Sequence, residues 1–185
     1  MAKLIKPPTD VSTINGIVGS VFLAGSIEMG KAIDWQQKVW EGVKDIPALG
    51  VLNPRRDDWD NSWKQEKSDK HFYGQVTWEL EGLENVDMVV YYFDPKTTSP
   101  VTMLELGLLS NKLTNFTPKT VVCCPEGFYR KGNIDIVCER YRHKMVDTLE
   151  DLIQEITKEF GYLSKLDKDF DSSNCSMGWN KGKNV

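Results

Sequence analysis

The sequence predicts an α/β fold in which a mostly parallel sheet of about five strands is covered by helices on both faces. Short, continuous apolar runs, typical of fully buried strands, alternate with segments whose apolar residues recur at helical spacing. Strands joined by helices favour right-handed crossovers and hence a parallel sheet. With 185 residues, 40% of them hydrophobic and 27% charged, the chain is long enough for one domain with a sizeable core.

Three segments divide the chain. Residues 1–19, which include two adjacent prolines, are expected to form an irregular lead-in. Residues 20–162 carry the alternating pattern and predict a single α/β domain. Residues 163–185 are rich in Asp, Ser, Asn, Lys and Gly and predict a polar tail, either disordered or draped on a neighbour.

The individual elements follow from the local pattern in chain order. The first half predicts strands at 21–24 and 50–52, helices at 31–44 and around 72–83, and a mobile polar loop at 61–70. The second half predicts a central strand at 88–93, a helix from Pro100 to Leu109 with Ser99 as N-cap, strands at 120–124 and 144–146, and helices at 134–141 and 149–160.

Composition narrows the function classes. A formal net charge of -4 argues against a nucleic-acid polymer as partner, and no apolar run is long enough to span a bilayer. Because the first 20 residues lack a signal-peptide core, a cytoplasmic location is expected. The four cysteines form no CxxC pair, which favours neither a zinc site nor a disulfide framework. With only two histidines, carboxylates must carry any acid–base chemistry.

One acid stands out among apolar neighbours. On a helical wheel, Glu105 shares a face with Val101, Leu108 and Leu109, so burial of that face would bury the carboxylate as well. Burial of an unpaired carboxylate costs several kcal/mol or raises its pKa. Such an acid is either used chemically or paired with an arginine, and this stretch alone favours neither interpretation.

The loops after four predicted strands carry polar side chains that a parallel sheet would bring to one edge. They hold Gly25-Ser26, Arg55-Arg56-Asp57-Asp58, the stretch from Asp94 to Ser99, and the stretch from Phe128 to Asn133. Each has a plainer interpretation, as a strand-to-helix turn or a solvated charged loop. Their convergence favours a functional role for Glu105.

At this point the chain resembles the nucleoside 2-deoxyribosyltransferases, especially the branch called nucleoside 2-deoxyribosyltransferase-like, and is similar to the related 2′-deoxynucleoside 5′-phosphate N-hydrolases. The similarity runs from about Val21 to Tyr141. The matching pieces are Phe22-Leu23-Ala24-Gly25-Ser26, Asn53-Pro54-Arg55-Arg56, Trp78-Glu79 to Asp87, Ser99-Pro100 to Glu105-Leu106-Gly107, and Pro125-Glu126-Gly127-Phe128. The resemblance implies a three-layer, flavodoxin-like or Rossmann-like parallel sheet.

The resemblance also implies residue roles. It makes Glu105 the nucleophile at the anomeric carbon, Ser99 a contact for the 5′ end of the sugar, and Glu79 the carboxylate that binds the base and acts as the second catalytic acid, with Asp94 a weaker candidate. The transferases typically have Asp where this chain has Ser99, and often Asp where it has Glu79. The substrate-binding candidates are Gly25, Ser26, Arg55, Arg56, Asp57, Asp87, Asp94, Ser99, Phe128 and Asn133.

The implied activity is transfer of a deoxyribosyl group from a 2′-deoxynucleoside to another free nucleobase through a covalent glutamate intermediate, as in nucleotide salvage, without a metal or organic cofactor. The alternatives are N-glycosidic hydrolysis of 2′-deoxynucleoside 5′-monophosphates, cleavage of NAD, and a non-catalytic nucleotide-binding module. A homo-oligomer is expected, because Trp179 lies in a polar tail that is hard to bury and because family sites are completed by a neighbouring subunit.

Overall fold

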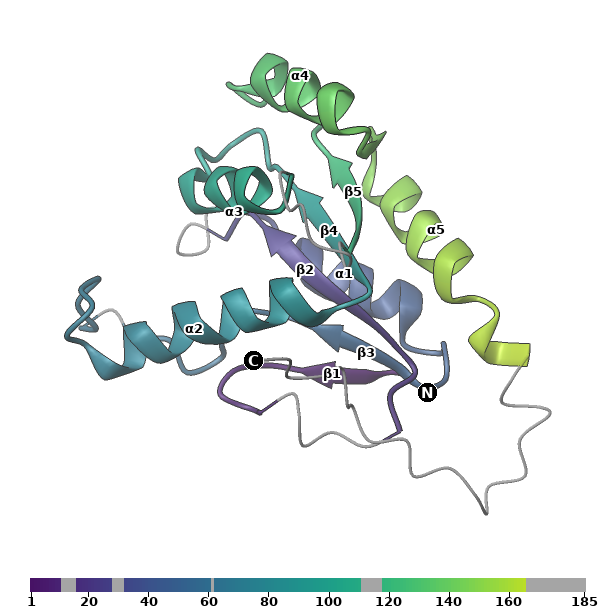
Figure 1. Ribbon diagram of the computed structural model, residues 1–185, viewed down its shortest axis with the longest axis horizontal. Coiled ribbons are helices and arrows are strands. Elements are labelled where there is room, and N and C mark those ends of the chain that lie inside the picture. The colour runs from purple at the N-terminus through teal and green to yellow at the C-terminus, as the bar shows by residue number, and fades with distance from the viewer. Residues whose placement is uncertain (11–15, 28–31, 61, 111–117, 166–185) are drawn as a thin grey trace, which may run out of the picture.

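The computed structural model describes residues 1–10, 16–27, 32–60, 62–110 and 118–165. These residues form an α/β fold around a six-stranded, all-parallel sheet with the strand order β1-β3-β2-β4-β5-β6 (Figure 1). The strands are β1 (Lys3–Ile5), β2 (Gly19–Gly25), β3 (Leu49–Leu52), β4 (Met88–Tyr92), β5 (Lys119–Cys123) and β6 (Lys144–Val146). The helices are α1 (Trp35–Val43), α2 (Lys70–Asn85), α3 (Pro100–Ser110), α4 (Lys131–Tyr141) and α5 (Leu149–Phe160).

The additional strand lies in the segment that was expected to be irregular. Strand β1 pairs in parallel with β3, with Leu4 opposite Val51, and Asn53 N donates to Ile5 O just beyond the pair. The sheet therefore has one strand more than predicted. Strand β1 has only three residues, and so short an apolar pattern does not predict a strand when its partner strand is unknown.

Two layers of helices cover the sheet. Helices α1 and α5 pack together on one face, and the cluster between them and the sheet includes Trp35, Val39 and Ile156. Helices α2, α3 and α4 cover the other face, where some of their apolar side chains pack in a cluster that contains Tyr91 and Phe93. In Figure 1, α2 crosses in front of the sheet while α1 lies behind it. The predicted three-layer architecture is confirmed.

Capping side chains explain where several helices begin. The carboxylate of Asp34 accepts from Gln37 N, that of Asp69 accepts from His71 N and Phe72 N, and the Thr148 hydroxyl accepts from Asp151 N. Helix α1 therefore begins at Trp35, four residues later than predicted, and residue 31, where the predicted helix began, lies outside the described residues.

The chain order of the strands reverses at the centre of the sheet. After β2 the chain adds β3 on one side, and β4 then returns to the other side of β2. Without the edge strand β1, this is the flavodoxin-like order, in which ligands bind outside the carboxyl ends of the strands at the reversal. The carboxyl ends of β2 and β4 are therefore the place to examine for a site.

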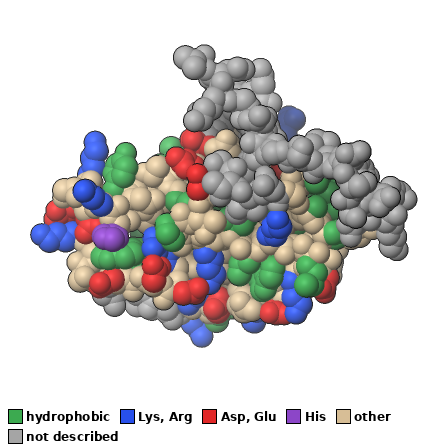
Figure 2. All heavy atoms as spheres, turned by 90° about the horizontal axis from the view of Figure 1, so that it is seen from below, with side chains coloured by type: hydrophobic (Ala, Val, Ile, Leu, Met, Phe, Trp, Pro, Cys, Tyr) green, Lys and Arg blue, Asp and Glu red, His purple; other side chains and the backbone are tan. Residues whose placement is uncertain are grey.

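The described helices include none that is both long and apolar enough to cross a membrane. The face of the molecule in Figure 2 mixes basic and acidic side chains and shows no large patch of either charge. Trp179 and most of the expected tail, from residue 166 onward, lie outside the described residues.

Candidate active site

The carboxyl end of β2 comes close to its neighbours at Gly25. A Cβ atom there would lie 2.6 Å from the Trp35 ring and 2.6 Å from Tyr92 O, so the position requires glycine. The next residue, Ser26, is buried; its N–H donates to Tyr92 O, and its own carbonyl accepts from the Trp35 indole at 3.0 Å. The Gly25-Ser26 turn is thus held rigidly at the chain reversal.

Three hydroxyl groups gather beside this turn. Ser26 Oγ lies 2.5 Å from Ser99 Oγ and 2.9 Å from Thr97 Oγ1, and the two latter atoms are 2.8 Å apart. Ser26 Oγ also accepts from Asp94 N at 2.9 Å. The cluster joins the end of β2 to the segment between β4 and α3, so it fixes the entry to the helix that carries Glu105.

Backbone conformation and hydrogen bonds fix the same segment. Ser99 has φ 45°, in the left-handed region that favours glycine and costs other residues on the order of 1 kcal/mol. The Asp94 carboxylate is buried and accepts from Ile33 N at 3.1 Å and from Lys96 N at 2.9 Å. Asp94 therefore serves as a structural acceptor, and its place among the substrate-binding candidates remains a prediction.

Glu105 lies one and a half turns into α3 and is 9% exposed. Its buried companions are Thr102, Leu106 and Leu109. The predicted helical face was wrong for Val101 and Leu108, which are 59% and 51% exposed. The Glu105 carboxyl is nevertheless buried, because it lies beside Leu106 and Leu109, the side chains of α3 that pack against β4.

Glu79 lies on α2 and is half-buried. Gln75, one turn earlier, donates from Nε2 to Glu79 Oε1 at 2.8 Å and to the carbonyl oxygen of Pro54 at 2.9 Å. This amide connects α2 to the loop after β3 and orients the carboxyl group. An i, i+4 spacing of Gln and Glu is visible in the sequence, although sequence reasoning did not single out Gln75.

The two carboxyl groups have altered acidities. Burial raises the pKa of Glu105 to about 8, and the negative charge of Glu79 adds to the rise. Burial raises the pKa of Glu79 to about 6, while the hydrogen bond from Gln75 opposes that rise. Between pH 6 and pH 8 the pair therefore tends to hold one proton, and the higher pKa of Glu105 favours that carboxyl as its place.

A small hollow between α2 and α3 reaches Glu105 from the surface. Its lining comes from the later turns of both helices, with Leu80, Leu83 and Glu84 on α2 and Leu108 and Leu109 on α3 around Glu105. The hydroxyl cluster lies at the beginning of α3, six residues before Glu105. Glu105 thus lines the hollow, and the hydroxyl cluster lies at the other end of the same helix segment.

Tyr91 is a further buried residue on the face of the sheet that α3 covers. Its side chain belongs to the cluster that also contains Leu106 and Leu109, and it is fully buried. The Tyr91 hydroxyl has no hydrogen-bond partner among the described residues. A buried hydroxyl without a partner costs about 1–3 kcal/mol. Sequence reasoning treated Tyr91 only as a strand residue.

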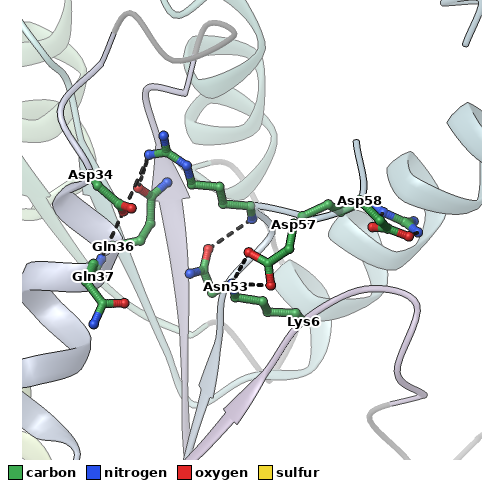
Figure 3. Close-up of polar contacts among 9 residues, drawn as sticks. Lys6, Asp34, Gln36, Gln37, Asn53, Asp57 and Asp58 are labelled. Atoms are coloured by element: carbon green, nitrogen blue, oxygen red, sulfur yellow. Dashed lines mark hydrogen bonds and ion pairs between the residues drawn. The ribbon is translucent and has the colours of Figure 1, made fainter. Parts of the chain in front are cut away.

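In the charged loop after β3, the side chains of Arg55, Arg56 and Asp57 already form ion pairs. Arg55 Nη1 lies 3.4 Å from Asp34 Oδ1 and 3.4 Å from Gln36 Oε1, and Arg56 forms two 2.8 Å hydrogen bonds with the Asp58 carboxylate. Asp57 accepts from Lys6 Nζ at 2.7 Å. Figure 3 shows Asp34 and Gln36 on one side of this loop and Asp57 with Lys6 on the other.

The other three substrate-binding candidates have different surroundings: Asp87 lies at the amino end of the sheet, Phe128 is buried in the core, and Asn133 is exposed. Asp87 precedes β4 at the amino end of the sheet, where its carboxylate accepts from Ser20 N and Ser20 Oγ. Phe128 is buried against Phe93, with ring centroids 5.0 Å apart. Asn133 is exposed in the first turn of α4. The structure therefore does not bring Asp87 to the carboxyl edge.

The described parts of the chain contain no group of three or more His, Cys, Asp or Glu side chains placed to hold a metal ion. Cys123, Cys124 and Cys138 are free and buried, and burial raises the pKa of each thiol. All three thiols are part of the hydrophobic core.

Comparison with known proteins agrees with this geometry. A family model described as nucleoside 2-deoxyribosyltransferase like matches residues 18–128, which is more than half of the chain. The match spans β2 to the Phe128 loop and so includes Ser26, Glu79, Ser99 and Glu105. No curated protein matches the sequence. The chain belongs to the nucleoside 2-deoxyribosyltransferase-like family.

Proposed function

We propose that this protein cleaves the N-glycosidic bond of 2′-deoxynucleosides and transfers the deoxyribosyl group to another nucleobase, with Glu105 as nucleophile and Glu79 as acid and base. The observation that carries the proposal is the buried carboxyl of Glu105, which lines the hollow between α2 and α3. The negative charge of Glu79 on α2 adds to the rise in the pKa of Glu105. Two carboxyl groups around one glycosidic bond supply the nucleophile and the proton that this chemistry needs.

In the first half-reaction, the Glu105 carboxylate attacks C1′ while the bond from C1′ to the base nitrogen breaks, and the electron pair of that bond leaves with the base. In the reactive state the single proton of the pair lies on Glu79, which leaves Glu105 ionised for the attack, and Glu79 gives this proton to the departing base. In the second half-reaction, a nitrogen of the acceptor base attacks C1′, the bond to Glu105 breaks, and Glu79 accepts the acceptor's proton. No water molecule is consumed.

The sugar would lie between Glu105 and the hydroxyl cluster. Ser26 and Ser99 are hydrogen-bonding groups at the beginning of α3, and the sugar's 5′ end needs such partners. Gln75 supports the proposed role of Glu79, because its amide holds one carboxyl oxygen and leaves the other for the base.

Hydrolysis of 2′-deoxynucleoside 5′-monophosphates is the second candidate. Ser99 favours it, since a hydroxyl can donate to a phosphate whereas an aspartate would repel it. Arg55 and Arg56 already contact Asp34 and Asp58, so a phosphate would have to compete with those carboxylates. This competition places the monophosphate second.

One substrate panel tests both candidates. The protein is incubated with a deoxynucleoside plus a free acceptor base, with a deoxynucleoside 5′-monophosphate alone, and with NAD, and the products are separated by chromatography. A new deoxynucleoside in the first mixture supports transfer. Reaction of the monophosphate alone would replace transfer by hydrolysis, release of nicotinamide would indicate NAD cleavage, and binding without turnover would indicate a non-catalytic module.

Mass spectrometry supplies a more direct test of the intermediate. Wild-type protein quenched during turnover without an acceptor base should carry a deoxyribosyl adduct on Glu105, and Glu105→Ala should carry none. An adduct on another residue would contradict the assignment of the nucleophile.

We also propose that the working form is a homo-oligomer in which a second copy covers α3. Val101, Leu104 and Leu108 are exposed on α3 at 59%, 62% and 51%, and Val76 and Leu80 on α2 are also exposed. Apolar side chains gathered in this way are typical of an interface. Because the same helices line the hollow at Glu105, a neighbouring copy would border the substrate.

A further inference from the structure

One buried polar group is not used in the mechanism above. Tyr91 lies in the central strand β4, between Ala24 of β2 and Val122 of β5, and its ring points to the face that α2 and α3 cover. Its hydroxyl is among three buried side-chain atoms without a hydrogen-bond partner in the described structure; the others are Gln36 Nε2 and Gln75 Oε1.

Glu105 reaches the same region from α3. The residue after it, Leu106, packs in the cluster that contains Tyr91. The negative charge of Glu105 contributes, after burial, to raising the pKa of Tyr91 well above its usual value. Both groups are therefore buried where α3 packs on β4, and burial keeps the proton on the phenol.

The surroundings of Glu105 otherwise oppose its ionised form. From α2, Glu79 and Glu84 approach as further carboxyl groups. The titratable groups of the shared core are the thiols of Cys124 and Cys138, whose pKa values burial raises. The nucleophile must nevertheless be ionised to attack C1′. A strong neutral hydrogen-bond donor beside it would favour that form, and the Tyr91 hydroxyl is such a donor.

We propose that Tyr91 is a positioning residue for Glu105: its hydroxyl donates a hydrogen bond to the ionised carboxylate, directly or through one water molecule. The hydrogen bond stabilises the attacking form and fixes the direction of its oxygen atoms. The Tyr91 hydroxyl, which has no hydrogen-bond partner in the described structure, gains one in this way. This inference rests on the proposed role of Glu105 as nucleophile.

The test compares wild-type protein with Tyr91→Phe, which keeps the ring and removes only the hydroxyl. The matched control is Tyr92→Phe, because Tyr92 is the next residue of β4 and packs on the opposite face against Trp35. The titration midpoint of Glu105 is measured by carbon-13 NMR of its side-chain carboxyl, assigned with Glu105→Gln. This readout requires no enzymatic activity.

Tyr91→Phe should raise the Glu105 midpoint by about one pH unit, since a charge-assisted hydrogen bond to the ionised form is lost. Its kcat at neutral pH should fall about tenfold, KM should change little, and the acid limb of the kcat profile should move to higher pH. Tyr92→Phe should leave the midpoint unchanged. The thermal midpoint of Tyr91→Phe should not fall, because the Tyr91 hydroxyl has no hydrogen bond in the described structure to lose.

An unchanged Glu105 midpoint in folded Tyr91→Phe overturns the proposal. A raised midpoint in a protein that acts on no deoxynucleoside supports the contact and refutes the proposed function, so the two failures are distinguishable. If Tyr91→Phe does not fold, 3-fluorotyrosine at position 91 replaces it as the probe. This stronger donor should lower the Glu105 midpoint, and an unaltered value would contradict the proposal.

Discussion

The side-chain amide of Gln75 lies 2.8 Å from Glu79 Oε1 and 2.9 Å from the carbonyl oxygen of Pro54, so one buried group ties a candidate catalytic carboxyl to the loop after β3. Gln75→Met keeps the side-chain length and removes both hydrogen bonds. We expect the free energy of unfolding to fall by about 1–2 kcal/mol, because Pro54 O loses its partner. We also expect the pKa of Glu79 to rise, because the Gln75 hydrogen bond lowers it.

Urea denaturation measures the first effect. Gln37→Met is the matched control, since Gln37 donates to Glu41 at 2.8 Å on the exposed face of α1. The control should change stability by less than about 0.5 kcal/mol. Equal losses in the two variants would mean that the contact with Pro54 does not stabilise the fold.

Replacement of Glu105 by alanine should remove catalysis and spare the fold. We expect kcat to fall at least about a thousandfold, since the covalent route is lost, with a circular-dichroism spectrum like that of the wild type. Glu81→Ala, an exposed position on α2, should retain nearly full activity. Most of the wild-type rate surviving in Glu105→Ala would eliminate the nucleophile assignment.

Stability should depend on pH through Glu105. Its pKa is about 8 in the folded protein against an ordinary value of 4.5, so the folded state retains a proton that the unfolded chain has released between those values. The associated stability is complete below pH 4.5 and is lost as the pH rises to 8, by roughly 2–4 kcal/mol. Glu105→Gln should show a flatter profile from pH 5 to pH 9 in chemical denaturation. Parallel profiles for the two proteins would contradict the raised pKa.

The arginines of the β3 loop distinguish the two candidate substrates. Under deoxyribosyl transfer, Arg55→Ala and Arg56→Ala should change KM for a deoxynucleoside less than about threefold, because each guanidinium is already paired with a carboxylate. Steady-state kinetics with both substrate types provide the measurement. If the monophosphate alone reacts and the double variant raises its KM, hydrolysis is the correct function.

Self-association through α3 should be sensitive to charge. Leu104→Glu places a carboxylate at the most exposed apolar position of that helix and should lower the mass found by light scattering. Ile136→Glu, at an exposed apolar position on α4, is the control and should leave the mass unchanged. A wild-type mass of one chain at working concentration would refute the oligomer.

The site was predictable where a local pattern and the strand order sufficed. Gly25-Ser26 and Ser99 follow predicted strands, and parallel strands end at one edge, so their meeting follows from the alternation alone. Asp87 precedes its strand, so the same rule puts it at the amino end, and its place among the substrate-binding candidates stays a prediction. The sequence shows whether a residue precedes or follows its strand, and in a parallel sheet this decides whether the residue lies at the amino or the carboxyl end.

The fold class, the central strand and the choice of Glu105 as the candidate acid could be predicted from the sequence, because continuous apolar runs and helical spacing are local patterns. The packing of distant segments was needed to show which face of α3 is buried, that Phe128 serves the core, that Gln75 holds Glu79, and that the Tyr91 hydroxyl is buried without a partner in the described structure. Those facts depend on how α2 and α3 pack on β4. Burial and hydrogen bonding are properties of groups that meet from distant parts of the chain, so the spacing of residues along one segment does not contain them.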